Sequence, residues 1–391
     1  MIAEMRTLTC QRTIQAPLDQ VYRAFTNAQA LREWFCDVAT VVPRIGGRVY
    51  VAWHTGNALM GKYTALTPNA TVELILRAMD DTDRSQVQVT MAAQGEAMHL
   101  TLVDSSDGAS WHQLSGAIEQ GWHEMLDNLQ SVLESGIDLR EVKRPMLGIY
   151  FGEQNPDERG ARISGVIDGM DAQKAGLQKE DLVLTVGGQA TPDWTSLTAA
   201  LQPYRAGDQV AVTFDRAGRQ TNATVTLSLR PITEIPQTPT ALAATIEKAY
   251  AAINDELTQL LAEIDDTRAT RAPAPHEWHI KQILAHLIAG ERDAHSYLST
   301  LIGSQERWQD DWEGNLPARL DAVIKVYPTA QQLLQAFIAN EAETVAILAA
   351  LPDAFVAHKR SYRRVAEWML NWFVHTQEHV AQMRATLEQP A

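Results

Sequence analysis

Two proline-containing breaks divide this 391-residue chain into segments with different hydrophobic patterns. The first break is "SGIDLREVKRPM", near residue 140, and the second is "RPITEIPQTPTAL", residues 230–242. Three prolines within nine positions of the second break favour a stiff extended linker. Because a chain of this length exceeds a typical single core, we expect separate domains. Their expected bounds are 1–140, 144–232 and 240–391.

The composition is that of a globular protein, with 45% hydrophobic and 21% charged residues. A formal net charge of −15 argues against a surface that follows phosphate backbones or anionic lipid, so we expect no nucleic-acid or membrane partner. The first residues, "MIAEMRTLTCQRTIQAP", lack the apolar core of a secretory signal. Cys10 and Cys36 are too few for a disulfide framework, which predicts a cytoplasmic location.

The first segment reads as a strand, a helix, several strands and a long final helix. "LTCQRTIQAP" alternates apolar and polar residues, and "LDQVYRAFTNAQALREWF" places Val21, Phe25 and Leu31 at helical intervals. Strand-like runs follow in "RVYVAW", "ATVELILRA", "SQVQVTMAA" and "MHLTLVDS", before the helical "GAIEQGWHEMLDNLQSVLES". A sheet wrapped around one long helix leaves an internal apolar cavity.

This order resembles the START-like (SRPBCC) superfamily over about residues 5–136, in the branch named after activators of a heat-shock chaperone ATPase. The matching stretches are "IQAPLDQVYRAFTNAQALREWF", "GKYTALTP" and "GWHEMLDNLQSVL". The resemblance implies an α+β helix-grip fold and a small apolar ligand in the cavity, without a fixed catalytic set. Candidate pocket residues are the large aromatics Trp34, Trp53, Trp111 and Trp122. The alternative is that they are ordinary core aromatics.

The second segment resembles a bacterial PDZ domain of the type attached to HtrA proteases, a β-sandwich or barrel with helices. The resemblance rests on "KAGLQKEDLVLTVGG", "SLTAALQ" and "AGDQVAVTFDRAGR", and it departs at Glu180, where glycine is usual. It implies that backbone N–H groups of Leu147, Gly148 and Ile149 bind the terminal carboxylate of a peptide or protein. No Ser, His and Asp set of a protease accompanies it. The alternative is a spacer whose groove is filled by its own chain.

The third segment is helical. Apolar residues recur every three and four positions, as in a bundle helix, at Leu242, Ile246, Ala249, Ile253, Leu257 and Leu260. Four helical stretches are expected, over residues 240–264, 278–302, 328–350 and 361–387. An all-α four-helix bundle is the simplest fold for these four helices.

The last stretch contains "NWFVHTQEHVAQM", in which His375 and His379 lie four apart. Both share the helix face that carries Trp368 and Trp372, so both point inward. Two imidazoles one turn apart can bind one metal ion, but two ligands seldom hold a divalent ion firmly. The alternative is a pair of polar residues packed in the core.

"EWHIKQILAHLIAGE" together with "HTQEHVAQM" resembles the DinB/YfiT-like family of metalloenzymes, over about residues 240–388. The resemblance implies an open three-histidine site at His286, His375 and His379. Neutral imidazoles suit zinc and nickel. Relatives include transferases and isomerases that use a low-molecular-weight thiol, which is the second cofactor that the resemblance implies.

Candidate general bases are Glu291 and Asp293 on the second helical stretch and Glu378 on the last. Each can equally be a solvated surface charge. Trp308 and Trp312, in the connection after the second stretch, are expected to cover the site or cap the bundle end. We expect the other histidines of this segment on the surface or in turns; they are His276, His279, His295 and His358.

The sequence thus predicts a cytoplasmic metal-binding protein with a possible enzymatic bundle. Its reaction would be transfer or hydrolysis on a small molecule, with the other domains binding an apolar ligand and a peptide C-terminus. The alternative is a non-enzymatic binding or stress-response adaptor with a structural metal. A carboxylate beside the metal would favour the enzyme, and its absence would favour the adaptor.

Overall fold

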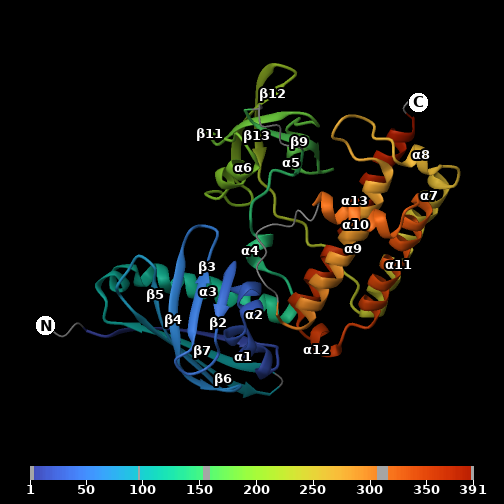
Figure 1. The fold of residues 1–391 in the computed structure, drawn as a ribbon. Coiled ribbons are helices and arrows are strands. Elements are labelled where there is room, and N and C mark those ends of the chain that lie inside the picture. The colour runs from blue at the N-terminus through green and yellow to red at the C-terminus, as the bar shows by residue number, and fades with distance from the viewer. Residues whose placement is uncertain (1–3, 96, 153–158, 306–315, 389–391) are drawn as a thin grey trace. The chain divides into compact units, whose positions relative to one another are not determined.

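The computed structural model describes residues 4–95, 97–152, 159–305 and 316–388. It divides into two compact units (Figure 1). The first unit combines residues 1–137 with 234–391, and the second comprises residues 138–233. Each unit is described by itself.

The amino-terminal part of the first unit is an antiparallel sheet in the order β1-β7-β6-β5-β4-β3-β2, with helix α3 across one face (Figure 1). Strand β7 alternates between buried and half-buried residues along its whole length, as a strand with one covered face must. The strands are β1 Arg6–Ile14, β2 Val38–Val41, β3 Arg48–Ala52, β4 Ala58–Thr67, β5 Thr71–Ala78, β6 Ser85–Gln94 and β7 Ala97–Ser106. The helices are α1 Leu18–Thr26, α2 Ala28–Trp34 and α3 Ala109–Ser135.

The expected single helix after β1 is two helices, because the chain turns at Asn27. Its backbone is extended, with φ −115° and ψ 133°, and its side chain accepts a hydrogen bond from the Ala30 N–H at 3.0 Å. An asparagine at this position caps the new helix and satisfies one of its free N–H groups. The strands β2 and β4 were also not anticipated as strands.

The second unit is a sheet in the order β13-β12-β10-β9-β8, with β11 beside β10 and helix α6 packed on it. Asp193 begins α6 by accepting a hydrogen bond from the Ser196 N–H at 2.7 Å. The strands are β8 Ile149–Phe151, β9 Ala161–Val166, β10 Leu182–Val186, β11 Gln189–Ala190, β12 Gln209–Arg216 and β13 Arg219–Thr226. The helices are α4 Leu139–Val142, α5 Asp171–Lys174 and α6 Trp194–Leu201.

Glu180 has a left-handed backbone, with φ 72°. A side chain in this conformation costs on the order of 1–2 kcal/mol, which explains why glycine is usual at this turn. The Glu180 carboxylate forms an exposed ion pair with Arg162 at 3.2 Å, which offsets little of that cost. The substitution lies in a turn before β10 and is separate from the groove-forming residues.

The carboxy-terminal part of the first unit is a helical bundle whose long helices begin at recognisable caps. Thr238, His279 and Thr329 each accept a hydrogen bond from the first turn of the helix that follows. The helices are α7 Pro239–Leu261, α8 Asp266–Ala269, α9 Ile280–Ile302, α10 Pro317–Val326, α11 Ala330–Ala349, α12 Asp353–Val356 and α13 Lys359–Glu388.

The expected long helices differ from α7, α9, α11 and α13 by no more than three residues at each end. Helix α10 was not anticipated, because its sequence was assigned to the connection after α9. The fold class is confirmed: an α+β START-like domain, a PDZ-type sheet domain and a helical bundle. No helix among the described residues is long and apolar enough to span a bilayer.

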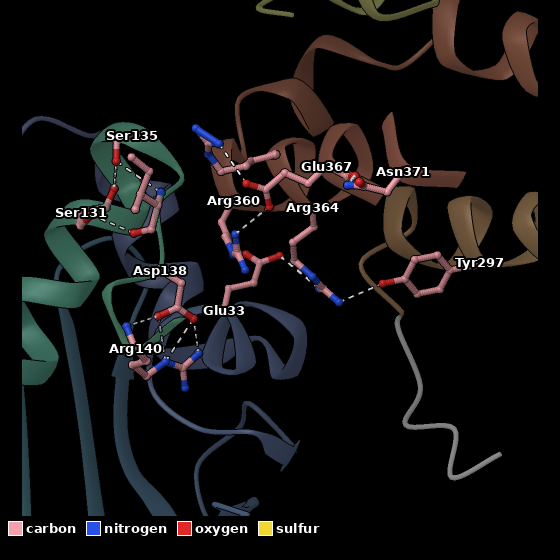
Figure 2. Close-up of polar contacts among 12 residues, drawn as sticks. Glu33, Ser131, Ser135, Asp138, Arg140, Tyr297, Arg360, Arg364, Glu367 and Asn371 are labelled. Atoms are coloured by element: carbon pink, nitrogen blue, oxygen red, sulfur yellow. Dashed lines mark hydrogen bonds and ion pairs between the residues drawn. The ribbon is translucent and has the colours of Figure 1, made fainter. Parts of the chain in front are cut away.

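Within the first unit, the start of α13 packs on α2 through buried polar groups. Glu33, which is 5% exposed, accepts a hydrogen bond from the Ser361 hydroxyl at 2.5 Å. The Arg364 guanidinium lies 3.8 Å from Glu33 and donates to the Tyr297 hydroxyl at 2.9 Å (Figure 2). Gln29 donates to the same Ser361 hydroxyl at 3.1 Å. Glu33 and the Gln29 amide nitrogen therefore both bond across the two elements to Ser361, while the Gln29 side-chain oxygen has no partner in the described residues.

His358, just before α13, predicts a pH dependence of the stability of this unit. Burial, together with the positive charge of Arg23, lowers the pKa of His358 to about 4. The unfolded chain, with an imidazole pKa of about 6.5, binds the proton first as pH falls. The contribution of His358 to stability is therefore present above pH 6.5 and is lost between about pH 6.5 and 4.

We expect the free energy of unfolding to drop by about 1–2 kcal/mol over this range, after discounting for partial exposure. Urea unfolding at a series of pH values measures the drop, which His358→Gln should reduce. His54→Gln, an exposed histidine in the same unit, is the control and should leave the drop unchanged. An equal drop in His358→Gln would contradict this account.

Candidate functional site

Three imidazoles converge between α9 and α13. The Nε2 atom of His375 lies 3.2 Å from that of His286 and 3.1 Å from that of His379. One ligand atom from each histidine lies within 4.8 Å of the other two. A tetrahedral ion with metal–nitrogen bonds of about 2.0–2.1 Å places neighbouring ligand nitrogens about 3.3–3.4 Å apart. The spacing of the three side chains therefore fits one shared metal ion.

The two helices bring these side chains together by ordinary packing. On α13, His375 and His379 are one turn apart, next to the buried Thr376 and Val380. On α9, His286 lies between the buried Ala285 and Leu287. All three histidines are half-buried, so the cluster is partly exposed.

Neighbouring side chains fix the orientation of the imidazoles. Nδ1 of His379 lies 2.9 Å from the Gln382 side-chain oxygen, which favours a proton on Nδ1 and leaves the Nε2 lone pair for a metal. Burial, and next the charge of His379, lowers the pKa of His375 and keeps its imidazole neutral near pH 7. Neutral imidazole is the form that binds metal.

Two tryptophans wall the cluster. The ring of Trp278 lies 5.0 Å from His286, and that of Trp372 lies 5.7 Å from His375, centroid to centroid. Gly290 makes room for Trp372, since a Cβ there would lie 3.3 Å from the indole. Apolar rings therefore flank His286 and His375.

The three candidate bases do not join this cluster. Glu291 is fully buried on α9 and accepts hydrogen bonds from Trp372 Nε1 at 2.6 Å, Tyr250 OH at 3.2 Å and Thr344 Oγ1 at 2.5 Å. These bonds occupy both of its oxygens, and through Trp372 it supports the packing against His375.

The other two acids lie elsewhere on the helices. Asp293 is 46% exposed and forms an ion pair with Arg319 at 2.7 Å, and Glu378 is exposed on α13. Among the described residues, the group of converging ligand atoms contains no carboxylate. Trp308 and Trp312, expected over the site, lie outside the described residues.

Sequence reasoning missed one half-buried and one buried polar side chain in the bundle. The expectation of a surface position for His295 is wrong: its side chain is 14% exposed, and its Nε2 lies 2.8 Å from Thr344 Oγ1. Glu341 on α11 is 1% exposed and accepts a hydrogen bond from Asn254, and burial raises its pKa to about 8. Glu341 shares a helix face with the buried Phe337 and Thr344, so helical spacing could have predicted that it points inward.

The second unit has a groove where the PDZ resemblance places it. A cavity of about 330 Å³ lies along β8, between Leu147, Gly148 and Ile149 on one side and Leu197 and Leu201 of α6 on the other. Gly148 has φ +84°, and a Cβ there would lie 2.8 Å from the Met170 side chain, so glycine is required. In the described residues β8 pairs only with β9, which leaves its outer edge to face α6.

The first unit has a cavity of about 380 Å³ between its sheet and α3. Trp53, Trp111 and Trp122 line it, whereas Trp34 does not and is 1% exposed in the core. The Trp34 indole donates to the Ala24 carbonyl at 2.9 Å. The four aromatics proposed from sequence therefore separate into three lining residues and one packing residue.

Family models match each part of the chain. Residues 15–134 match activator of Hsp90 ATPase homolog 1-like protein, residues 145–227 match the PDZ domain, and residues 249–383 match the DinB superfamily. The chain carries these domains in this order. Both helices that supply the converging histidines lie within the DinB-superfamily match.

Curated relatives match about a quarter of the chain. A probable periplasmic serine protease do/HhoA-like of Haemophilus influenzae is 31% identical over 100 residues, which is 23% of this chain and 21% of the protease. The periplasmic pH-dependent serine endoprotease DegQ of Escherichia coli is 29% identical over 100 residues, covering 23% and 22%. The chain thus spans about a fifth of the length of these curated relatives.

Among solved structures, a protein from Chromobacterium violaceum is 26% identical to this chain with a TM-score of 0.29. The match covers 32% of this chain and 96% of that protein.

Proposed function

We propose that the DinB-superfamily domain binds one divalent transition ion, zinc or nickel, at His286, His375 and His379, and uses it for transfer of a low-molecular-weight thiol to a small electrophile. The observation that carries the proposal is the convergence of the imidazoles, with Nε2 atoms 3.1 and 3.2 Å apart. Three neutral nitrogen ligands suit both metals and leave a coordination position open.

The argument for a metal rests on the three imidazole nitrogens and their arrangement. Without a metal ion, the three ring nitrogens lie close together, and any two of them can share only one proton in a hydrogen bond. A cation placed there lies near three lone pairs at once. Partial exposure of the histidines gives a path for metal and substrate.

When bound, the metal would supply a Lewis acid that stabilises a thiolate. The protein side chains do the remaining work. Gln382 holds the His379 ring in the tautomer that presents Nε2. Glu291 holds Trp372 in place, and Trp278 and Trp372 offer an apolar wall for the body of a small substrate.

Thiol transfer fits this cluster better than hydrolysis does. A thiol with an ordinary pKa of about 8.5 loses its proton readily, whereas water needs strong activation or a base. The group of ligand atoms contains no carboxylate among the described residues. The same observation favours the alternative of a structural metal in a non-enzymatic adaptor, and an activity measurement separates the two.

His379→Ala should lower the metal content. Wild-type protein loaded with zinc and desalted should retain about one ion per chain, and the ion should raise its melting temperature by mass action. The variant should retain little zinc and show no metal-dependent shift, as measured by elemental mass spectrometry and thermal unfolding. His276→Asn, an exposed position with φ 70° that asparagine tolerates, is the control.

Retention of zinc by His379→Ala, or failure of the wild type to take up metal, would contradict the metal site. The enzymatic part is tested by thiol addition to a chromogenic electrophile, which the loaded wild type should accelerate and His379→Ala should not. Metal binding without acceleration would contradict the transferase and support the adaptor.

The PDZ domain is proposed to bind a peptide C-terminus, and the START-like domain a small apolar ligand. The groove beside β8, with the glycine turn at Gly148 and the cations Arg144 and Arg230 on its lining, supports the first. The aromatic cavity of about 380 Å³ supports the second. A cytoplasmic location belongs to the same proposal, since the chain has only two cysteines.

A peptide with a free carboxylate and an apolar last residue should bind the PDZ groove at least tenfold more tightly than its amidated form. The backbone N–H groups recognise the charge, and Leu197 and Leu201 line the pocket for the side chain. Fluorescence polarisation with both peptides measures the ratio. Equal binding of the two forms would contradict carboxylate recognition, and no binding of either would support a spacer.

A further inference from the structure

The outer face of the START-like sheet is hollowed over β3, β4 and β5, which are neighbours in the sheet (Figure 1). This outer cavity has a volume of about 700 Å³. Val51, Tyr63 and Leu74, one from each strand, are buried on the opposite face of the sheet. Because side chains alternate along a strand, the residues next to them point outward.

The backbone itself helps to keep this face hollow. Two glycines, Gly46 and Gly61, belong to the lining and add no side chain to fill it. At Gly61 a Cβ would lie 1.8 Å from the Ile75 carbonyl oxygen, so only glycine fits between the two strands. The hollow is therefore a feature of the sheet and not only of its side-chain conformations.

The lining of the outer cavity contains four cations and no acid. Arg48 on β3 lies directly opposite Lys62 on β4. Arg84 directly precedes Ser85, whose partner Leu76 directly precedes Arg77, so these two arginines also lie side by side. Like charges at opposite positions destabilise a sheet. The lining thus holds two cationic pairs, each with an electrostatic cost in the absence of an anion.

The protein does not neutralise these pairs within the part of the chain that the structure describes. Arg48, Lys62 and Arg84 form no ion pair there. Arg77 donates to two carbonyl oxygens, at 3.4 and 3.1 Å. Glu73, the acid two residues before Ile75 on the same strand, accepts a hydrogen bond from the Gln88 amide at 2.7 Å. Such a concentration of cations stands out in a chain with a net charge of −15.

Apolar side chains occupy the space between the two cationic pairs. Tyr50 on β3 lies opposite Met60 on β4, and both line the outer cavity together with Ile75 of β5. Tyr50 is 36% exposed. Pockets for small molecules usually have volumes of about 300–1,000 Å³ and combine an apolar surface with a few charged groups. The outer cavity has both properties.

We propose that the outer cavity binds a small organic anion with a flat or apolar body and two negative groups, one at each cationic pair. Arginine and lysine donate charge-assisted hydrogen bonds to carboxylate or phosphate oxygens. The body of the ligand covers Tyr50 and Met60. This is a second site of the domain, independent of the apolar ligand proposed for the cavity under α3. The two cavities share only Leu76, Arg77 and Arg84 in their linings.

The test compares three probes with the same ring system: naphthalene-2,6-dicarboxylate, 2-naphthoate and 2-naphthamide. Equilibrium dialysis against the full-length chain at low salt gives each affinity. The dicarboxylate should bind about tenfold more tightly than the naphthoate, because its second carboxylate reaches the second cationic pair. The neutral amide should bind most weakly. Addition of about 0.5 M sodium chloride should remove most of this preference.

Variants locate the effect. Arg48→Gln and Lys62→Gln change residues that line the outer cavity and not the cavity under α3, and each should bring the affinity for the dicarboxylate close to that for the naphthoate. Each also relieves the repulsion between the pair, so neither should lower the melting temperature. Arg6→Gln is the control, an exposed cation on β1 at the other edge of the sheet, and should keep the full preference.

Equal binding of the three probes, or no binding of the dicarboxylate, would overturn the anion site. A preference for the dicarboxylate that survives in both Arg48→Gln and Lys62→Gln would overturn its assignment to the outer cavity. Succinate, a dicarboxylate without a ring, should bind at least tenfold more weakly than naphthalene-2,6-dicarboxylate. Equal binding of these two would overturn the role of Tyr50 and Met60 and leave only counter-ion binding by surface cations.

Discussion

A single buried carboxylate joins the long helices of the bundle. Glu291 on α9 receives hydrogen bonds from Tyr250 on α7, Thr344 on α11 and Trp372 on α13. A buried carboxylate is stable only with its oxygens satisfied, so these helices must keep their mutual register. His286 lies on the same helix as Glu291, and His375 lies three residues after Trp372. The geometry of the imidazole cluster therefore depends on this network.

Helix α13 also carries the contact with the START-like domain. Its first turn holds Ser361 against Glu33, and its middle holds His375 and His379. A rise of about 1.5 Å per residue separates Ser361 and His375 by about 21 Å along one continuous helix. The bundle and the START-like domain thus form one compact unit, consistent with how the chain divides.

Local patterns predicted the long helices and the pairing of His375 with His379, because both depend on spacing along one element. Local patterns did not assign His286 to a particular face of its helix, because buried residues occur around much of α9. The family resemblance supplied that residue. The hydrogen bonds of Glu291 could not be predicted from the sequence because its partners lie 41, 53 and 81 residues away. The break at Asn27 was missed because helical spacing continues across the turn.

The central claim is that three histidines hold one ion with a position open to a thiol. X-ray absorption at the metal edge of the zinc-loaded, full-length chain tests it most directly. The account predicts three imidazole nitrogens at about 2.0–2.1 Å and, after addition of a low-molecular-weight thiol, a new sulfur scatterer at about 2.3 Å. Fewer than three imidazoles, or a shell that does not change when thiol is added, would contradict it.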